Sequence, residues 1–134
     1  MSLGQPAGTK LNMFGRIIHD AFGEFAYHVG SSLTAKKGEP WRDVDVRLIL
    51  DDDEFDRMFP GIDDPGRVVL HYRHQALAVV WSEFGSNMTG LPIDFQIQQM
   101  TYANTNAECE GPRSPLGLMM YRAEQRRSLG GDPQ

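Results

Sequence analysis

Apolar residues near the start of the chain recur at the spacing of a helix. Between Leu11 and Phe25 they fall at Met13, Ile17, Ile18, Ala21, Phe22 and Phe25. This spacing places them on one face of a helix, so we predict a helix over Leu11–Phe25. We expect a short strand at Tyr27–Val29, and then a turn at Gly30–Ser32 that exposes backbone N–H groups.

Two later segments alternate apolar and polar residues. In Asp43–Leu50 every even position is apolar, and in Pro92–Gln98 every odd position is apolar. Because successive side chains of a strand point to opposite faces, each segment predicts a strand with one buried and one polar face. The polar positions are Asp43, Asp45, Arg47, Asp94, Gln96 and Gln98.

The chain between these two strands predicts two helices. Asp51–Glu54 supplies an N-cap and an acidic first turn for a short helix that Pro60 ends. A longer amphipathic helix is expected from Pro65 to Gly85, with a loop from Gly85 to Gly90. The β-branched residues at its start leave a strand at Arg67–Tyr72 as an alternative.

The remaining chain and the total length complete the fold prediction. Beyond Gln99 the sequence is rich in Asn, Gly and Pro, and we expect one further helix there, at Leu118–Arg127. A chain of 134 residues with 40% hydrophobic residues has the size and apolar content of one folded domain. We therefore predict a single α+β domain over residues 11–127, a small mixed β-sheet packed against helices. Flexible ends are expected at residues 1–10 and 128–134.

Charge and cysteine content narrow the functional classes. The formal net charge of −5 argues against a protein that coats nucleic acid or an anionic membrane. Cys109 is the single cysteine, so no internal disulfide can form, and no Cys/His cluster has zinc spacing. The sequence shows neither a secretory leader nor an apolar run long enough to span a membrane. We expect a cytoplasmic protein without a membrane partner.

Three acidic residues on the polar faces of the predicted strands form the main candidate site. Asp43 and Asp45 share one face, with Cα atoms roughly 7 Å apart, and Asp94 projects from the other strand. Because carboxylates gathered without counter-charge are costly, a divalent metal ion is a natural partner for them. The turn at Gly30–Ser32 can form a nest of amides and hydroxyls for phosphate oxygens.

Together these pieces resemble a known pattern. Val29-Gly30-Ser31 is followed by an 11-residue spacer, by Asp43-Val44-Asp45-Val46 and then by Ile93-Asp94-Phe95. In this order they resemble the nucleotidyltransferase superfamily that includes DNA polymerase beta, and more closely its small, minimal members. The resemblance covers most of the chain and implies the nucleotidyltransferase fold.

The resemblance also implies an activity. It is a two-metal transfer of a nucleoside monophosphate from a nucleoside triphosphate to a hydroxyl, with release of pyrophosphate. Asp43 and Asp45 would bind both Mg²⁺ ions, while Asp94 would bind the metal that activates the acceptor and would help deprotonate it. The triphosphate would be held by the turn residues Gly30, Ser31 and Ser32.

The loaded site would need further positive charge. Three carboxylates contribute about −3, two Mg²⁺ ions +4 and a triphosphate about −4, so a deficit remains. The candidates to fill it are Lys36, Lys37, Arg42 and Arg47. The expected partners are a nucleoside triphosphate and an acceptor, which the sequence leaves open as a protein, an RNA or a small molecule. A partner protein or a homo-oligomer also stays open.

Two arginines depart from the family pattern. Many members carry a small residue where Arg42 stands. Arg47 either pairs with Asp45 and weakens metal binding or reaches a phosphate, and we expect the phosphate contact because the loaded site is short of cations. These departures keep open a catalytically weakened relative that acts as a nucleotide-binding or protein-interaction module. A further alternative is that the three acids only solvate a face of the sheet. The Gly30–Ser32 turn and the spacing of the motifs argue against it.

Other candidate residues have simpler interpretations. His71 and His74 lack a third ligand at suitable spacing, so we expect packing or surface histidines rather than metal ligands. We expect His28 to be a strand histidine with a satisfied hydrogen bond. Trp41 either stacks on a base or packs on the core.

Overall fold

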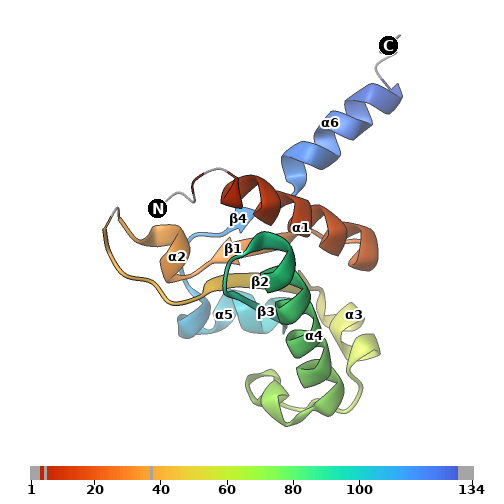
Figure 1. Ribbon diagram of the computed structural model, residues 1–134. Helices are drawn as coiled ribbons and strands as arrows, with labels where there is room; N and C mark the ends of the chain where they lie inside the picture. Colours follow the sequence, from red (N-terminus) through yellow and green to blue (C-terminus); the bar gives the residue numbers. More distant parts are fainter. Residues whose placement is uncertain (1–3, 5, 37, 130–134) are drawn as a thin grey trace.

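A four-stranded mixed sheet forms the centre of the computed structural model, which describes residues 4, 6–36 and 38–129 (Figure 1). Its strands, in the spatial order β3-β2-β1-β4, are β1 (Ala26–Val29), β2 (Val44–Leu50), β3 (Ile93–Gln99) and β4 (Ser114–Pro115). β1 pairs antiparallel with β2 and with β4, and β2 pairs parallel with β3. The expected α+β class with a mixed sheet is confirmed, and the three expected strands lie within one residue of their predicted ends.

The helices of the described chain surround this sheet. They are α1 (Ala7–Phe22), α2 (Ser31–Thr34), α3 (Asp52–Met58), α4 (Tyr72–Thr89), α5 (Met100–Thr105) and α6 (Leu118–Leu129), with 3₁₀ helices at Pro65–Leu70 and Ala107–Cys109. α1 begins before the expected Leu11 and ends at Phe22, where Gly23 adopts a left-handed conformation. The predicted cap of α3 is confirmed, because the Asp51 side chain accepts a hydrogen bond of 2.8 Å from the Glu54 amide.

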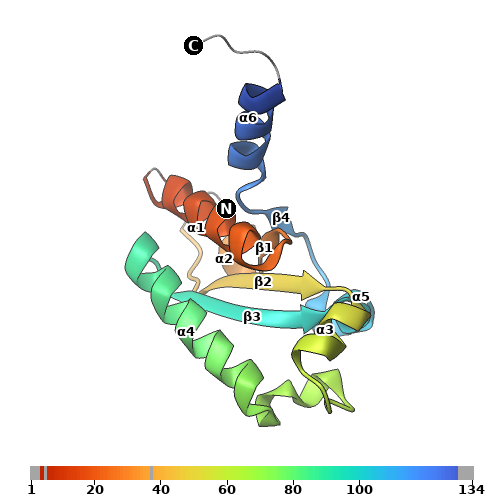
Figure 2. The same ribbon diagram turned by 90° about the vertical axis from the view of Figure 1, so that its right-hand side faces the viewer.

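α1 and α4 lie over the same face of the sheet (Figure 2). Aromatic side chains join the two helices there. The rings of Phe22 and Trp81 lie 5.3 Å apart between centroids, and Trp81 lies 5.9 Å from Phe95 on β3. Phe14 and Phe95 are fully buried. This face therefore forms the hydrophobic core, as the alternation in β2 and β3 predicts.

The course of α4 differs from the prediction at both ends. A 3₁₀ helix occupies Pro65–Leu70, and α4 starts only after His71, so neither a continuous helix from Pro65 nor a strand at Arg67–Tyr72 is present. At the other end, α4 runs through Gly85 to Thr89, which makes the predicted loop there wrong. Gly85 is buried against the Phe14 ring, which would lie 2.7 Å from a Cβ at that position. This glycine permits close packing inside the helix instead of ending it.

The free edge of β3 is covered by polar side chains of α4. Ser86 Oγ accepts a hydrogen bond of 2.9 Å from the Ile93 amide, and Ser82 Oγ accepts one of 2.8 Å from the Phe95 amide. The buried His74 lies with Nε2 2.7 Å from the Ile97 carbonyl oxygen. Backbone groups that another strand would otherwise satisfy are thus paired with a helix.

The chain after β3 is more ordered than the sequence suggests. α5 and β4 were not predicted, whereas the helix expected at Leu118–Arg127 is present as α6. Both views show α6 projecting from the rest of the molecule (Figures 1 and 2). Arg16 Nη1 on α1 lies 2.6 Å from a carboxylate oxygen of Glu124 on α6. Among the described residues, no helix combines the length and apolar character needed to cross a membrane.

Candidate functional site

The turn after β1 requires glycine. Gly30 has φ +81° and ψ −166°, a backbone region that is essentially closed to other residues. A Cβ at Gly30 would also collide with the carboxylate of Asp45 on β2. The structure therefore brings the predicted turn and one of the predicted acids into direct contact.

The two serines of the turn have different surroundings. Ser31 is exposed beside Gly30, whereas Ser32 is fully buried. Ser32 Oγ lies 2.7 Å from Nε2 of the buried His28, and burial lowers the pKa of His28. The expected hydrogen bond of His28 is confirmed. In this conformation the buried Ser32 hydroxyl pairs with His28, and its predicted contact with a phosphate stays a prediction.

Asp45 and Asp94 face each other across the parallel pair of strands. They are register partners of β2 and β3, and their side chains are 24% and 39% exposed. One nitrogen, Arg47 Nη2, lies 3.6 Å from Asp45 Oδ1 and 3.5 Å from Asp94 Oδ2. The two carboxylates thus converge on a single cation, and in this structure that cation is the Arg47 guanidinium.

Further hydrogen bonds hold Arg47 in this place. Its Nη1 donates to the Asp94 carbonyl oxygen at 2.7 Å and to the Val46 carbonyl oxygen at 3.1 Å, and its side chain is only 14% exposed. Of the two contacts weighed for Arg47, the structure contains the ion pair with Asp45. The expected phosphate contact would require the side chain to change partners.

Burial affects the charge of the Asp45 carboxyl. Burial is the main cause that raises its pKa above the ordinary value, and Arg47 opposes that shift. Repulsion from Asp94 and Asp43 raises the pKa further. Arg47 therefore offsets part of the penalty that burial imposes on the ionised form of this carboxyl.

Asp43 is not held in this cluster. It precedes β2, is 38% exposed and pairs with Nε of the exposed Arg42 at 3.4 Å. Within the part of the chain that the structure describes, no three His, Cys, Asp or Glu side chains are grouped as a metal site. The physical reason is that Arg47 lies between Asp45 and Asp94 while Asp43 is paired with Arg42.

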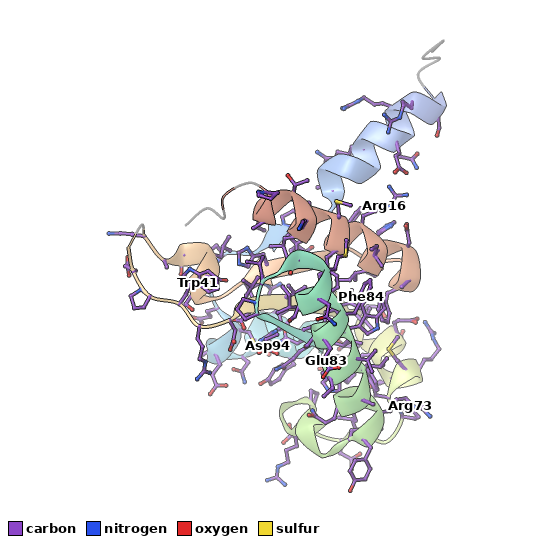
Figure 3. All side chains as sticks on the ribbon, in the orientation of Figure 1. Arg16, Trp41, Arg73, Glu83, Phe84 and Asp94 are labelled. Carbon is purple, nitrogen blue, oxygen red and sulfur yellow. The ribbon has the colours of Figure 1, made fainter. Side chains whose placement is uncertain are left out.

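Two pockets flank the Arg47 cluster. The first, named here the sheet pocket, has a volume of about 280 Å³ and is lined mainly by Gly30, Asp45, Arg47, Gln96, Gln98, Tyr102 and the segment 108–113, in which every residue but Gly111 contributes. The second, the α4 pocket, has a volume of about 480 Å³ and is lined by Asp43, Asp94 and Gln96 with α4 residues that include Val79 and Glu83. Figure 3 shows Asp94 and Glu83 on the same side of the molecule. The predicted acids are therefore divided between two neighbouring pockets.

Two of the other predicted cations line neither pocket. Lys36 and Arg42 are exposed on the loop before β2. Trp41 on the same loop is half-buried and packs against the core (Figure 3). Lys37 lies outside the described residues, so of the three described cations considered for the triphosphate, Arg47 is the one placed at the site.

Sequence reasoning missed the wall of the sheet pocket. Tyr102 on α5 and Arg113 before β4 come from a segment that was expected to be irregular. Arg113 is fixed by hydrogen bonds of 3.0 Å to Asn104 Oδ1 and 2.8 Å to the Ala103 carbonyl oxygen. The alternation in β3 did place Gln96 and Gln98 on the polar face, and this was the available signal for the pocket.

His71 and His74, at the start of α4, have packing roles, as expected. His74 is 2% exposed and stacks edge-on against Phe59, with ring centroids 5.0 Å apart. His71 forms the N-cap of α4 and also contacts the Phe59 ring. Neither lies near the acids that line the two pockets.

Comparison of the chain with protein-family models, with curated proteins and with solved structures finds no match. The interpretation of the site therefore depends on its own residues and geometry.

Proposed function

We propose that the protein is an Mg²⁺-dependent nucleotidyltransferase with the nucleotidyltransferase fold. It moves a nucleoside monophosphate from a nucleoside triphosphate to a hydroxyl and releases pyrophosphate. The observation that carries the proposal is the convergence of Asp45 and Asp94 on one cation position beside the Gly30 turn. The order of motifs along the chain supports the same activity.

The residues of the site can bind Mg²⁺ if Arg47 moves away from the two carboxylates. The donors are carboxylate oxygens, which Mg²⁺ prefers, and two of them already face a shared cation at 3.5 and 3.6 Å. Asp43 can join them because its pair with the exposed Arg42 is weak. Arg47 must withdraw from between Asp45 and Asp94. When bound, Mg²⁺ would neutralise charge on the phosphates and favour ionisation of the acceptor hydroxyl.

The protein groups then have distinct tasks. Gly30 lets the backbone approach the phosphates closely, and the exposed Ser31 hydroxyl can donate to a phosphate oxygen. Asp94 lines the α4 pocket, where it can accept the proton of an acceptor hydroxyl. Arg47 lines the sheet pocket together with Gly30 and, once released, can bind the triphosphate through charge-assisted hydrogen bonds.

A specific observation favours a second candidate function. Arg47 is largely buried, contacts both carboxylates and donates to two backbone carbonyls. A cation so well held competes with Mg²⁺, which is the condition expected of a weakened relative that binds nucleotide or a protein partner without transfer.

Transfer of label from nucleotides tests the proposal. Purified protein is incubated with Mg²⁺, each of the four α-³²P-labelled nucleoside triphosphates and extract fractions that hold protein, RNA or small molecules. We expect label in one fraction, with release of pyrophosphate, and its loss in Asp45→Asn. Asp56→Asn, at an exposed position of α3, is the matched control and should keep full activity.

Two other outcomes separate the candidates. Asp45-dependent nucleotide binding without transfer in any fraction would favour the binding module. If no nucleotide binds, the transferase and the nucleotide-binding form of the module are both wrong, and only the protein-interaction form of the module is left.

A further inference from the structure

The sheet pocket continues from the Gly30 turn along the polar face of the sheet. Its floor includes Asp45, Arg47 and Ile49 of β2 and the side chains of Gln96 and Gln98. Tyr102 and residues 108–113 form the opposite wall. A volume of about 280 Å³ is at the small end of ligand pockets, so it suits one small molecule or part of one.

Because the three acids line two different pockets, each substrate can be assigned to one of the pockets. Gly30 and Asp45 line the sheet pocket, whereas Asp43 and Asp94 line the α4 pocket. If Asp94 serves the acceptor, as the proposed function has it, the acceptor approaches through the α4 pocket. The sheet pocket is then left for the part of the nucleotide beyond its phosphates.

The polar groups in this pocket suit a nucleobase. Gln98 Nε2 lies 3.8 Å from Cys109 Sγ, and Gln96 Nε2 lies 3.5 Å from Asp94 Oδ1, so both amides make only long contacts. Within the described chain, neither carboxamide oxygen accepts a hydrogen bond. A carboxamide presents a donor beside an acceptor, which is the arrangement that pairs with the edge of a base. Tyr102 adds an aromatic ring at the wall.

The charges at the rim favour one class of base. A carboxamide can turn over to match either an amino or a carbonyl edge, but a carboxylate can only accept. Glu108 and Glu110 are exposed on the wall segment, and Glu108 is close enough to help raise the pKa of Tyr102, although burial is the larger cause. These carboxylates attract an exocyclic amino group and repel a carbonyl oxygen.

We infer that the sheet pocket binds the base of the nucleotide and selects bases that carry an exocyclic amino group over uracil, through Gln98, Gln96 and the carboxylates of Glu108 and Glu110. This inference rests on the proposed function, because it takes the phosphates to lie at the Gly30 turn. Adenine, cytosine and guanine each carry an exocyclic amino group that can donate to a carboxylate, whereas uracil carries carbonyl oxygens instead.

Calorimetric titration with Mg²⁺ tests the inference. The probes are the α,β-methylene analogues of ATP, CTP, GTP and UTP, together with inorganic tripolyphosphate, which has no base. We expect the ATP, CTP and GTP analogues to bind at least about tenfold more tightly than the UTP analogue. Gln98→Ala should lower affinity for the ATP analogue roughly tenfold and leave tripolyphosphate affinity unchanged. Glu108→Gln should reduce the preference for ATP over UTP.

Gln125→Ala provides the matched control, because Gln125 is exposed on α6 and lines neither the sheet pocket nor the α4 pocket. It should leave every affinity unchanged, and unaltered tripolyphosphate binding also shows that Gln98→Ala is folded. Equal binding of all four analogues, or an unchanged ATP-to-UTP ratio in both Gln98→Ala and Glu108→Gln, would overturn the inference alone. Failure of all four analogues and of tripolyphosphate to bind would overturn the proposed function as well.

Discussion

The two faces of strands β2 and β3 differ in polarity and in burial. On one face Val46 and Phe95 are fully buried among aromatic rings of α1 and α4. On the other face, one residue away along each strand, Asp45 and Asp94 remain partly exposed and gather around Arg47. Alternation thus separates the residues that stabilise the fold from those that can bind a ligand, and neighbouring substitutions should have different consequences.

The largest effect on stability is expected on the apolar face. Phe95→Ala removes a fully buried ring that packs 5.9 Å from Trp81, and should lower the free energy of unfolding by about 3–5 kcal/mol. Gln96→Ala, the next residue on the polar face, should change it by no more than about 0.5 kcal/mol. Urea denaturation of both variants measures the difference. Similar losses in the two would show that the faces are not separated in this way.

Gly30→Ala tests whether the close contact between Gly30 and Asp45, on the polar face, contributes to stability. The positive φ and the collision with Asp45 should together cost about 1–3 kcal/mol and displace the acid. Gly61→Ala is the control, because Gly61 has φ +88° but open space around its Cα. Denaturation and nucleotide titration should show a smaller stability loss and intact binding for the control. Equal behaviour of the two variants would contradict a special contact at Gly30.

Removing Arg47 should weaken the fold and improve the metal site. Arg47→Gln leaves Asp45 and Asp94 without their cation, and partial exposure limits the expected loss of stability to about 1–2 kcal/mol. Mn²⁺ binding without nucleotide, followed by electron paramagnetic resonance, should become tighter, and added Mg²⁺ should restore the stability. Arg113→Gln, which removes a cation of the same pocket that does not contact the acids, serves as control. Unchanged Mn²⁺ affinity in Arg47→Gln would exclude competition between Arg47 and the metal.

The smallest expected effect is a pH dependence that originates outside the polar face. Burial lowers the pKa of His28 and His74 below the ordinary value of 6.5. As pH falls below about 6.5, the unfolded chain therefore takes up protons before the folded one, and stability decreases by at most about 1.4 kcal/mol per pH unit for each histidine. Urea denaturation between pH 7.5 and 5 should show this slope, with a shallower one in His74→Gln. An unchanged slope in that variant would mean that His74 does not carry the effect.

Local sequence patterns were sufficient to predict the strands of the sheet and part of the candidate site. Alternation identified β2 and β3 and put Asp45, Arg47 and Asp94 on one face, because the period of a strand is independent of its neighbours. The role of Gly85 was misjudged because a glycine that ends a helix and one that admits a ring look alike in sequence. The partners of Arg47 and the wall formed by residues 108–113 depend on contacts across the fold, which no local spacing encodes.

The hydroxyls of Ser82 and Ser86 and the imidazole of His74 have a consequence for assembly. They occupy the outward backbone groups of Ile93, Phe95 and Ile97, the positions at which a foreign strand would dock. An unprotected parallel edge of this length is a template for strand addition and for cross-β aggregation. Because α4 side chains pair with the backbone of this edge, no further strand can be added to the sheet there. Molecules that approach from this side contact the outer surface of α4.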